Sequence, residues 1–214
     1  MEKQQELKKF EEQEKQLHIS LDEIMSLPTM HGNFSALLNV DYQPPTSNFD
    51  RSQVLGRVVR LMTVKEDRYS IALEQAAGEK LFAIIVENDV ICSVLIKNNC
   101  FMKNRAILIP NNKCGYEESP ADVIEYVNTV TKGKAKHALS LIQFNAFYER
   151  SMKSIYGDVF VCEDVETAKK ISFDPRVNAK CVTLDGTVYE PSGVITGGNE
   201  IRKELSILNR IQAI

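Results

Sequence analysis

Side chains suited to acid–base or metal chemistry are sparse in this sequence. The three histidines, His18, His31 and His137, have no Cys, Asp or Glu at the spacing of a metal site or a catalytic triad. The spacings of phosphate-binding loops, dinucleotide-binding loops and nucleophile elbows are also absent from the sequence. We therefore predict no catalytic residue, no metal site and no cofactor, and we expect that the chain is not an enzyme.

The cysteines predict no metal site or disulfide framework either. Their spacing matches no zinc pattern, and an odd number does not suit a secreted framework of disulfides. Several of them lie in apolar strings, which predicts buried thiols. The five are Cys92, Cys100, Cys114, Cys162 and Cys181.

Positive charge is gathered in short clusters in the second half of the sequence. Solvation explains each cluster alone, but the clusters form a phosphate-binding surface if the fold brings them together. Such a surface binds DNA weakly and without sequence preference, because backbone contacts need only positive charge. The candidate DNA-binding residues are Lys132, Lys134, Lys136, Lys169, Lys170, Arg176 and Lys180.

The most specific pattern is a glycine-rich stretch that follows a hairpin signal. Asp185 and Gly186 lie between two β-prone segments and predict a two-residue turn in which both residues have positive φ. Glycines then surround apolar, β-prone residues. Because glycine weakens a strand, the cluster predicts a place where another backbone comes very close. Its members are Gly193, Val194, Ile195, Gly197 and Gly198.

Composition is that of an ordinary globular protein. The 214 residues are 43% hydrophobic and 26% charged, with a net charge of −3. The sequence has no apolar run near the roughly 20 residues of a membrane helix. Residues 1–16 are charged and rich in acidic residues, which argues against a secretory or mitochondrial signal. We therefore expect a cytosolic or nuclear protein.

Strand and helix signals alternate between two helices with apolar stripes. The hydrophobic pattern predicts a mixed α and β class. The terminal stripes fit either coiled-coil helices or surface helices packed on their own domain. Strands are expected over 54–64, 81–86, 106–110, 159–162 and 181–184, and helices over 2–27, from Pro120 at the first helical position, over 164–171, and over 201–212.

Segments in a consistent order resemble the hinge domain of structural maintenance of chromosomes (SMC) proteins. The resemblance covers about residues 51–200 and is closest to condensin subunits of the second SMC type. Ser192 and Glu79 stand where the family often has glycine. The matching segments are Ala72–Glu74 with Ala77–Gly78, Ala106–Asn111, Ala138–Ile142, Tyr156–Cys162 with Gly157 ending a helix, Ala168–Ile171, the turn Asp185–Gly186, and the glycine-rich stretch.

The resemblance implies an α+β hinge of two similar subdomains, each with a sheet and helices. An antiparallel coiled-coil stub, formed by the two terminal helices, flanks the hinge. The implied boundaries are 1–28 for the ascending helix, 29–50 for a lead-in, 51–135 and 136–200 for the subdomains, and 201–214 for the descending helix.

The implied function is dimerisation. The hinge pairs with the hinge of a partner condensin SMC subunit, through the glycine-rich stretch, to build the V-shaped dimer used in chromosome condensation. The implied location is the nucleus and chromosomes, with a cytoplasmic pool, and the ATPase heads of the family lie outside this sequence. Two alternatives remain: a homodimeric hinge of the bacterial type, and a small α/β enzyme such as a transferase with Asp158 or Asp185 as acid or base.

Overall fold

The computed structural model describes residues 39–101, 105–198 and 206–212. The chain divides into two units, Met1–Val40 and Asp41–Ile214, and the elements described below belong to the second. The predicted ascending helix and residues 29–38 of the predicted lead-in lie outside the described residues. The predicted descending helix is described only within 206–212.

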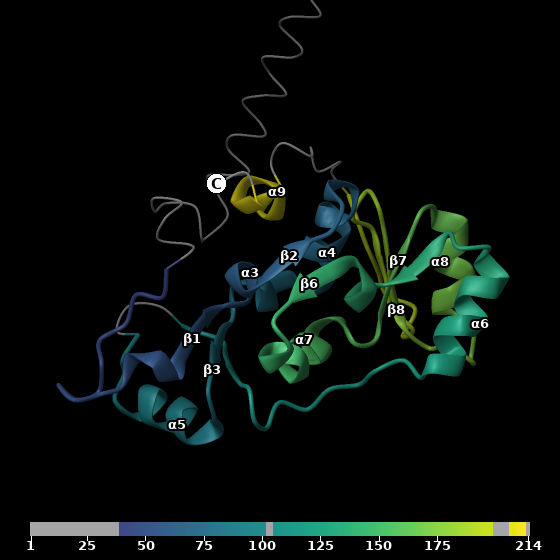
Figure 1. Ribbon diagram of the computed structural model, residues 1–214. Helices are drawn as coiled ribbons and strands as arrows, with labels where there is room; N and C mark the ends of the chain where they lie inside the picture. The colour runs from purple at the N-terminus through teal and green to yellow at the C-terminus, as the bar shows by residue number, and fades with distance from the viewer. Residues whose placement is uncertain (1–38, 102–104, 199–205, 213–214) are drawn as a thin grey trace, which may run out of the picture. The chain divides into compact units, whose positions relative to one another are not determined.

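Helices and strands alternate along the chain, so the predicted mixed α/β class is confirmed (Figure 1). The α-helices are α3 (Val58–Leu61), α4 (Ser70–Ala77), α5 (Asp89–Lys97), α6 (Ala121–Thr131), α7 (Glu149–Tyr156), α8 (Val165–Ser172) and α9 (Ile207–Gln212). The 3-10 helices are η1 (Arg51–Gln53), η2 (Asp67–Tyr69), η3 (Gly78–Phe82), η4 (Ala138–Leu141) and η5 (Ala146–Tyr148). The strands are β1 (Val54–Arg57), β2 (Met62–Val64), β3 (Ile84–Val86), β4 (Leu108–Pro110), β5 (Ala135–His137), β6 (Ile142–Phe144), β7 (Val159–Cys162), β8 (Lys180–Thr183), β9 (Val188–Tyr189) and β10 (Ile195–Thr196).

A three-stranded sheet, in the order β1-β3-β4, forms the first half of the fold. Strand β3 runs antiparallel to β1 and parallel to β4, with α5 as the connection between the parallel pair. All residues of β3 are buried, as expected for a central strand flanked on both sides. The register shifts within β1 at Gly56, whose φ of +132° is open mainly to glycine.

A two-stranded ladder joins parts of the chain that are distant in sequence. Strand β2 pairs antiparallel with β6, with Val64 opposite Ile142. The ladder continues past Val64, because the Lys65 N–H donates to the Leu141 carbonyl at 2.9 Å. The region before α5 is thereby tied to the region after β5.

A five-stranded sheet, in the order β10-β9-β8-β7-β5, forms the second half. Strands β7 and β8 are parallel and the other neighbours antiparallel. One face carries Phe160, Cys162, Cys181 and Tyr189, which pack with residues of α6 and α8 into one core. Figure 1 shows these two helices on the same side of β7 and β8. Strands β10 and β5 form the two edges.

The buried-thiol prediction is confirmed for three of the five cysteines. Cys100, Cys162 and Cys181 are buried, whereas Cys92 and Cys114 are partly exposed, and all five thiols are free. Burial raises the pKa of Cys92 to about 11, so this thiol stays protonated at neutral pH. In the part of the chain that the structure describes, no helix is long and apolar enough to cross a membrane.

Three predicted strands are shorter than expected, and one of them, 106–110, is a strand only within β4 (Leu108–Pro110). The segment 54–64 is interrupted by the helical turn α3, and residues 81–82 belong to η3 rather than to a strand. Val58 and Val59 are both fully buried, and consecutive residues of a strand would instead point to opposite faces. Burial of both side chains therefore favours a helical turn here, despite the preference of valine for strands.

The predicted two-residue hairpin turn is a three-residue loop. Thr183 and Thr187 face each other, since the Thr183 N–H donates to the Thr187 carbonyl at 2.9 Å. Only Gly186 in the loop has a positive φ, of +93°. Asp185 supports the loop by accepting hydrogen bonds from the Thr183 hydroxyl and the Thr187 N–H. These bonds favour the longer loop, in which Asp185 needs no left-handed backbone.

Helix ends follow their capping residues. Asp164 caps α8 by accepting a hydrogen bond from the Thr167 N–H at 2.8 Å, so the helix begins one residue later than predicted. Pro120 occupies the N-cap of α6, just outside the first helical position predicted for it. Gly157 follows the last residue of α7, which confirms the predicted helix end.

Candidate functional site

Strand β10 is an exposed apolar edge. Among the described residues it pairs with β9 alone, and Val194 and Ile195 are 54% and 51% exposed. An unpaired strand edge presents a row of main-chain donors and acceptors to another strand. Half-exposed valine and isoleucine beside such a row make this edge the candidate contact surface.

The direction of the free main-chain groups follows from the ladder. The Glu190 N–H donates to the Val194 carbonyl at 2.9 Å, which makes these residues a hydrogen-bonded pair. Ile195 lies opposite Tyr189, one step further along the antiparallel register. Since hydrogen-bonded and non-hydrogen-bonded pairs alternate, the N–H and C=O of Ile195 point away from β9. Ile195 therefore offers both groups to a further strand.

The three glycines of this stretch differ in backbone conformation and in the space around them. Gly193 has a φ of +91° and closes a turn by donating its N–H to the Glu190 carbonyl at 2.9 Å. A Cβ on Gly197 would come within 2.9 Å of the Thr187 methyl group. The missing side chain of Gly197 therefore leaves room for Thr187 of the same chain. A Cβ on Gly198 would meet nothing within 4 Å. A Cβ on Gly193 would also meet nothing within 4 Å, but its positive φ disfavours a side chain, so Gly198 is the glycine of the three that has both open space and no such restriction.

The strand next to β10 is firmly held. The Ser172 hydroxyl at the end of α8 donates to the Tyr189 carbonyl at 3.2 Å, and both residues are buried. The hydrogen bond from Thr183 is the main cause that lowers the pKa of Asp185, which keeps its loop charged and bonded. The candidate edge is therefore presented on a rigid support.

Three of the candidate DNA-binding lysines come together. Lys132, Lys134 and Lys170 line a shallow depression of about 190 Å³ between α6 and α8. Asp164 lies in the same depression and pairs with the Lys134 ammonium at 3.0 Å. The ion pair raises the pKa of Lys134 and neutralises much of its charge. Glu166 also lines the depression, so its net charge is only weakly positive.

The remaining candidate cations lie apart from this depression. Lys136 lies over the ring of Tyr69, with its Nζ 5.4 Å from the ring centroid. Arg176 stacks on Tyr126 at 4.0 Å. Lys180 begins β8, opposite Val159 at the start of the parallel strand β7. The Lys134 carbonyl instead accepts a hydrogen bond from the Glu163 N–H, just past the other end of β7. Lys169 is exposed on α8.

The two carboxylates considered for acid or base chemistry are engaged within the fold. Asp158 accepts a hydrogen bond from the Ser119 hydroxyl at 2.8 Å. Asp185 holds the hairpin loop through Thr183 and Thr187. Asp158 joins its strand to the segment before α6, and Asp185 holds its own loop together. Both carboxylates therefore have a structural role in the fold.

A family described as "SMC proteins Flexible Hinge Domain" matches residues 51–172. The chain belongs to the SMC hinge family. The chain is 38% identical to structural maintenance of chromosomes protein 2 of Schizosaccharomyces pombe over 181 residues, which is 84% of this chain and 15% of that protein. Identity to the human protein of the same name is 32% over 178 residues, which is 83% of this chain and 15% of that protein. The resemblance found in the sequence is confirmed.

Solved SMC hinges have the same fold. An asymmetric dimer of the Geobacillus stearothermophilus SMC hinge domain gives a TM-score of 0.64 at 23% identity, covering 78% of this chain and 74% of that chain. The Pyrococcus furiosus SMC hinge domain gives 0.57 at 26% identity, covering 70% and 75%. The chain thus spans most of a hinge, but about 15% of the length of its curated relatives.

Sequence analysis missed a second exposed apolar surface on the hinge, on helix α5. Val90 and Ile96 are 63% and 66% exposed, while Ile91 and Leu95 of the same helix are buried. Sequence analysis used this apolar run only to predict a buried thiol at Cys92, and it predicted no helix here. A helical count would have separated 91 and 95 on one face from 90 and 96.

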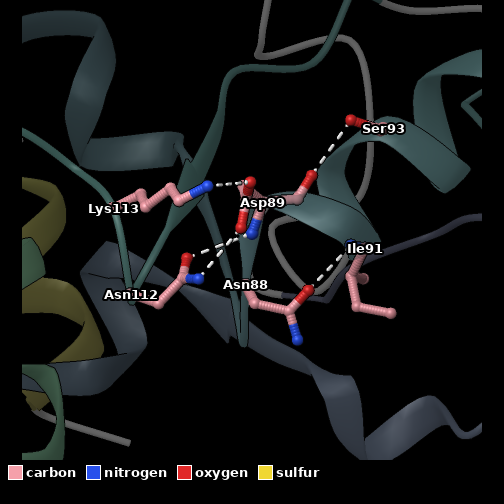
Figure 2. A network of polar contacts seen from close by, with 6 residues as sticks. All are labelled: Asn88, Asp89, Ile91, Ser93, Asn112 and Lys113. Atoms are coloured by element: carbon pink, nitrogen blue, oxygen red, sulfur yellow. Dashed lines mark hydrogen bonds and ion pairs between the residues drawn. The ribbon is translucent and has the colours of Figure 1, made fainter.

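A polar network fixes the start of α5 to the turn after β4 (Figure 2). Asn88 caps the helix by accepting a hydrogen bond from the Ile91 N–H at 3.0 Å. Asp89 exchanges two hydrogen bonds with Asn112 and accepts a third, of 2.8 Å, from the Lys113 ammonium. The exposed apolar side chains of α5 are thereby held in place relative to the three-stranded sheet.

Proposed function

We propose that this hinge pairs with the hinge of a partner condensin SMC subunit, and that the β10 edge carries the contact. The heterodimer is the V-shaped dimer that serves chromosome condensation, in the nucleus and on chromosomes with a cytoplasmic pool. The observation that carries the proposal is the outward N–H and C=O of Ile195 beside two half-exposed apolar side chains. Similarity to SMC proteins 2 supports the condensin assignment.

Strand addition is the mode of pairing that this edge supports. A partner strand laid against β10 would accept from and donate to Ile195, each hydrogen bond contributing about 0.5–1.5 kcal/mol net. Val194 and Ile195 would lose their remaining exposure in apolar pockets of the partner. Main-chain bonds then supply affinity, and the two side chains supply specificity for that partner.

The β10 edge alone is too small for a stable pair. Stable interfaces bury roughly 800 Å² on each partner, from about 20–30 residues. The exposed face of α5, with Val90 and Ile96, offers a second apolar area on the same chain. We therefore assign α5 as the second contact surface for the partner hinge.

The proposed role is assembly rather than catalysis. The hinge family is a dimerisation module, and Asp158 and Asp185 serve the fold through their hydrogen bonds. We expect the isolated hinge to hydrolyse no ATP. ATP turnover that copurifies with the chain and disappears on a point mutation within it would contradict this expectation.

DNA contact is a secondary proposal for the depression of Lys132, Lys134 and Lys170. Its weakly positive charge supports low affinity without sequence preference. The more distant candidates, Lys136, Lys169, Arg176 and Lys180, would contact a longer stretch of DNA if the duplex follows the surface.

Mass measurement by sedimentation tests the pairing. We expect the chain to be monomeric alone and to form a one-to-one complex when mixed with a condensin partner hinge. A homodimer that does not exchange with the partner would establish the bacterial type of hinge instead. A chain that stays monomeric in both cases would contradict the proposed function.

A further inference from the structure

A groove lies beside β5, where the start of α6, the β5–η4–β6 segment and α7 come together. Its volume is about 390 Å³. This is at the low end of the roughly 300–1,000 Å³ of small-ligand pockets, so it suits one or two bulky side chains. The lining residues are Glu118, Ile124, His137, Leu139, Phe144, Ala146, Glu149 and Lys153.

The floor of the groove is apolar and rigid. Ile124, Leu139 and Phe144 are only partly buried, and so keep apolar surface open to an occupant. His137 is 9% exposed, and its Nε2 lies 2.8 Å from the Gly157 carbonyl. The same imidazole packs on Phe160 with ring centroids 5.5 Å apart. These contacts fix the floor before any ligand arrives.

The rim of the groove carries an excess of negative charge. Lys153 pairs with Glu118 at 3.0 Å and with Glu149 at 2.9 Å, so one ammonium faces two carboxylates. The hydrogen bonds to Glu149 and then Glu118 raise the pKa of Lys153 well above its usual value. The ammonium therefore stays charged, and the three groups together carry about one net negative charge.

Further carboxylates lie in the segment that forms one side of the groove. Glu117, Asp122 and Glu125 are exposed and lie in the stretch that supplies Glu118 and Ile124 to the groove. The ion pairs within the described residues do not include these three. The nearby cations are Arg150, whose guanidinium donates to the Cys114 carbonyl and lies over the Tyr116 ring, and Lys65 and Lys80, whose ammonium groups donate to the carbonyls of Ser140 and Ser154. The surface around the apolar floor thus keeps a small excess of carboxylates over cations.

The groove is separate from the proposed pairing edge. It adjoins β5, and β5 and β10 form opposite edges of the five-stranded sheet. An occupant here leaves β10 free. We propose that the groove docks a basic peptide segment, with one bulky apolar side chain as anchor, from a protein other than the partner hinge.

Charge and size select this occupant. The apolar floor takes the anchor, while the carboxylates of the rim attract flanking lysines or arginines. DNA is repelled by the same carboxylates. A second copy of this chain is the alternative occupant, which the test below separates from a basic peptide.

The test uses short synthetic peptides in which one Leu or Phe is flanked by Lys and Arg. Two matched sets replace the basic residues by Glu or the apolar residue by Ser. Fluorescence polarisation of the labelled peptides with the whole chain measures affinity. We expect only the basic set with an apolar anchor to bind, with an affinity that falls as salt is added.

Charge reversal locates the binding. In the groove variant, Glu117→Lys, Asp122→Lys and Glu125→Lys are combined, and we expect binding at least about tenfold weaker. The control combines Asp41→Lys, Asp67→Lys and Glu87→Lys, which are also exposed and make the same change in net charge in segments that do not line the groove. We expect the control to bind within about twofold of wild type. Circular dichroism and pairing with the partner hinge check that both variants fold.

Three outcomes would overturn the proposal. The first is that no basic peptide binds better than its Glu counterpart. The second is that the groove variant and the control lose affinity equally, because attraction would then be to net charge alone. The third is self-association of the chain that the groove variant abolishes, which would assign the groove to a second copy. None of these results depends on whether the β10 edge pairs with a partner.

Discussion

The carboxylate of Glu74 accepts a hydrogen bond of 2.8 Å from the backbone N–H of Leu208, although the two residues are 134 positions apart. The Ser206 hydroxyl donates to the same oxygen, and Ser206 and Leu208 are both buried. Glu74 therefore fixes the start of α9 on α4. Burial raises the pKa of Glu74, and the hydrogen bonds from Ser206 and Leu208 offset part of that rise.

Two substitutions of Glu74 distinguish the contribution of its hydrogen bonds to stability from that of its charge. We expect Glu74→Ala to lower the free energy of unfolding by about 1–3 kcal/mol, because buried donors lose their acceptor. Glu74→Gln keeps an acceptor and removes the burial of a charge, so we expect it to be at least as stable as wild type at neutral pH. Urea unfolding of the two variants measures both effects. Equal stability of Glu74→Ala and wild type would contradict the proposed anchoring.

The pH dependence of this comparison has a definite sign. The pKa of Glu74 is higher in the folded chain, so its contribution to stability is fully present below the unfolded pKa and is lost as the pH rises through the folded pKa. Gln does not titrate. We therefore expect the stability of Glu74→Gln relative to wild type to increase between roughly pH 4 and pH 7. A difference that shrinks over this range would show that the pKa of Glu74 is lowered in the folded chain.

Gly157 tests the close packing of α7 on the segment before α6. A Cβ at this position would lie 2.4 Å from the Glu117 carbonyl oxygen and 2.5 Å from that of Lys153. We expect Gly157→Ala to lower the free energy of unfolding by about 1–3 kcal/mol, since backbone must shift to admit the methyl group. Gly115→Ala, in the same segment with nothing within 4 Å, is the control. Equal unfolding midpoints for the two variants would show that the backbone relaxes freely there.

Features encoded by neighbouring residues could be predicted from the sequence. The cap Asp164 and the apolar spacing of Val165, Ala168 and Ile171 lie within a few residues of one another, and α8 forms within one residue of the prediction. The glycine-rich stretch likewise distinguishes β10 from the other strands by its residue types alone. Capping and periodicity act locally, so one sequence suffices to detect them.

Features that depend on the tertiary fold could not be predicted in this way. The sequence grouped Lys134 with Lys136, yet one pairs with Asp164 and the other lies over Tyr69. The contact of Glu74 with Leu208 joins distant segments and has no local signal. Sequence spacing shows which residues can lie on one face of a helix or strand. The residues that this face contacts depend on the packing of the whole fold.

DNA binding should depend on the depression between α6 and α8. We expect combined Lys132→Glu and Lys170→Glu to weaken DNA binding more than Lys134→Glu alone, because Asp164 already neutralises Lys134. The slope of log affinity against log salt should become shallower by about 0.9 for each phosphate that the variant no longer neutralises. Fluorescence anisotropy of a labelled duplex over a salt series measures both. Affinity that is insensitive to salt, or unchanged by all three substitutions, would rule out this surface.

Pairing through β10 should be sensitive to proline at one position of the strand and not at its neighbour. The N–H of Ile195 points away from β9, so Ile195→Pro removes a donor that only a partner strand would use. We expect a folded chain whose association with the partner hinge is weakened by about tenfold, close to the loss of one hydrogen bond and some apolar packing. In Thr196→Pro the missing donor faces β9, and stability should fall instead.

The same distinction applies to the two final glycines of the stretch. A Gly198→Glu substitution enters open space in the single chain, but it would bury an unpaired carboxylate in a pair, at a cost of several kcal/mol. Gly197→Glu would instead collide with Thr187 and lower the stability of the chain itself. Sedimentation with the partner hinge and circular dichroism of each variant separate the two effects. If Gly198→Glu and Ile195→Pro both pair as wild type does, the partner contacts another surface, and the exposed face of α5 becomes the principal candidate.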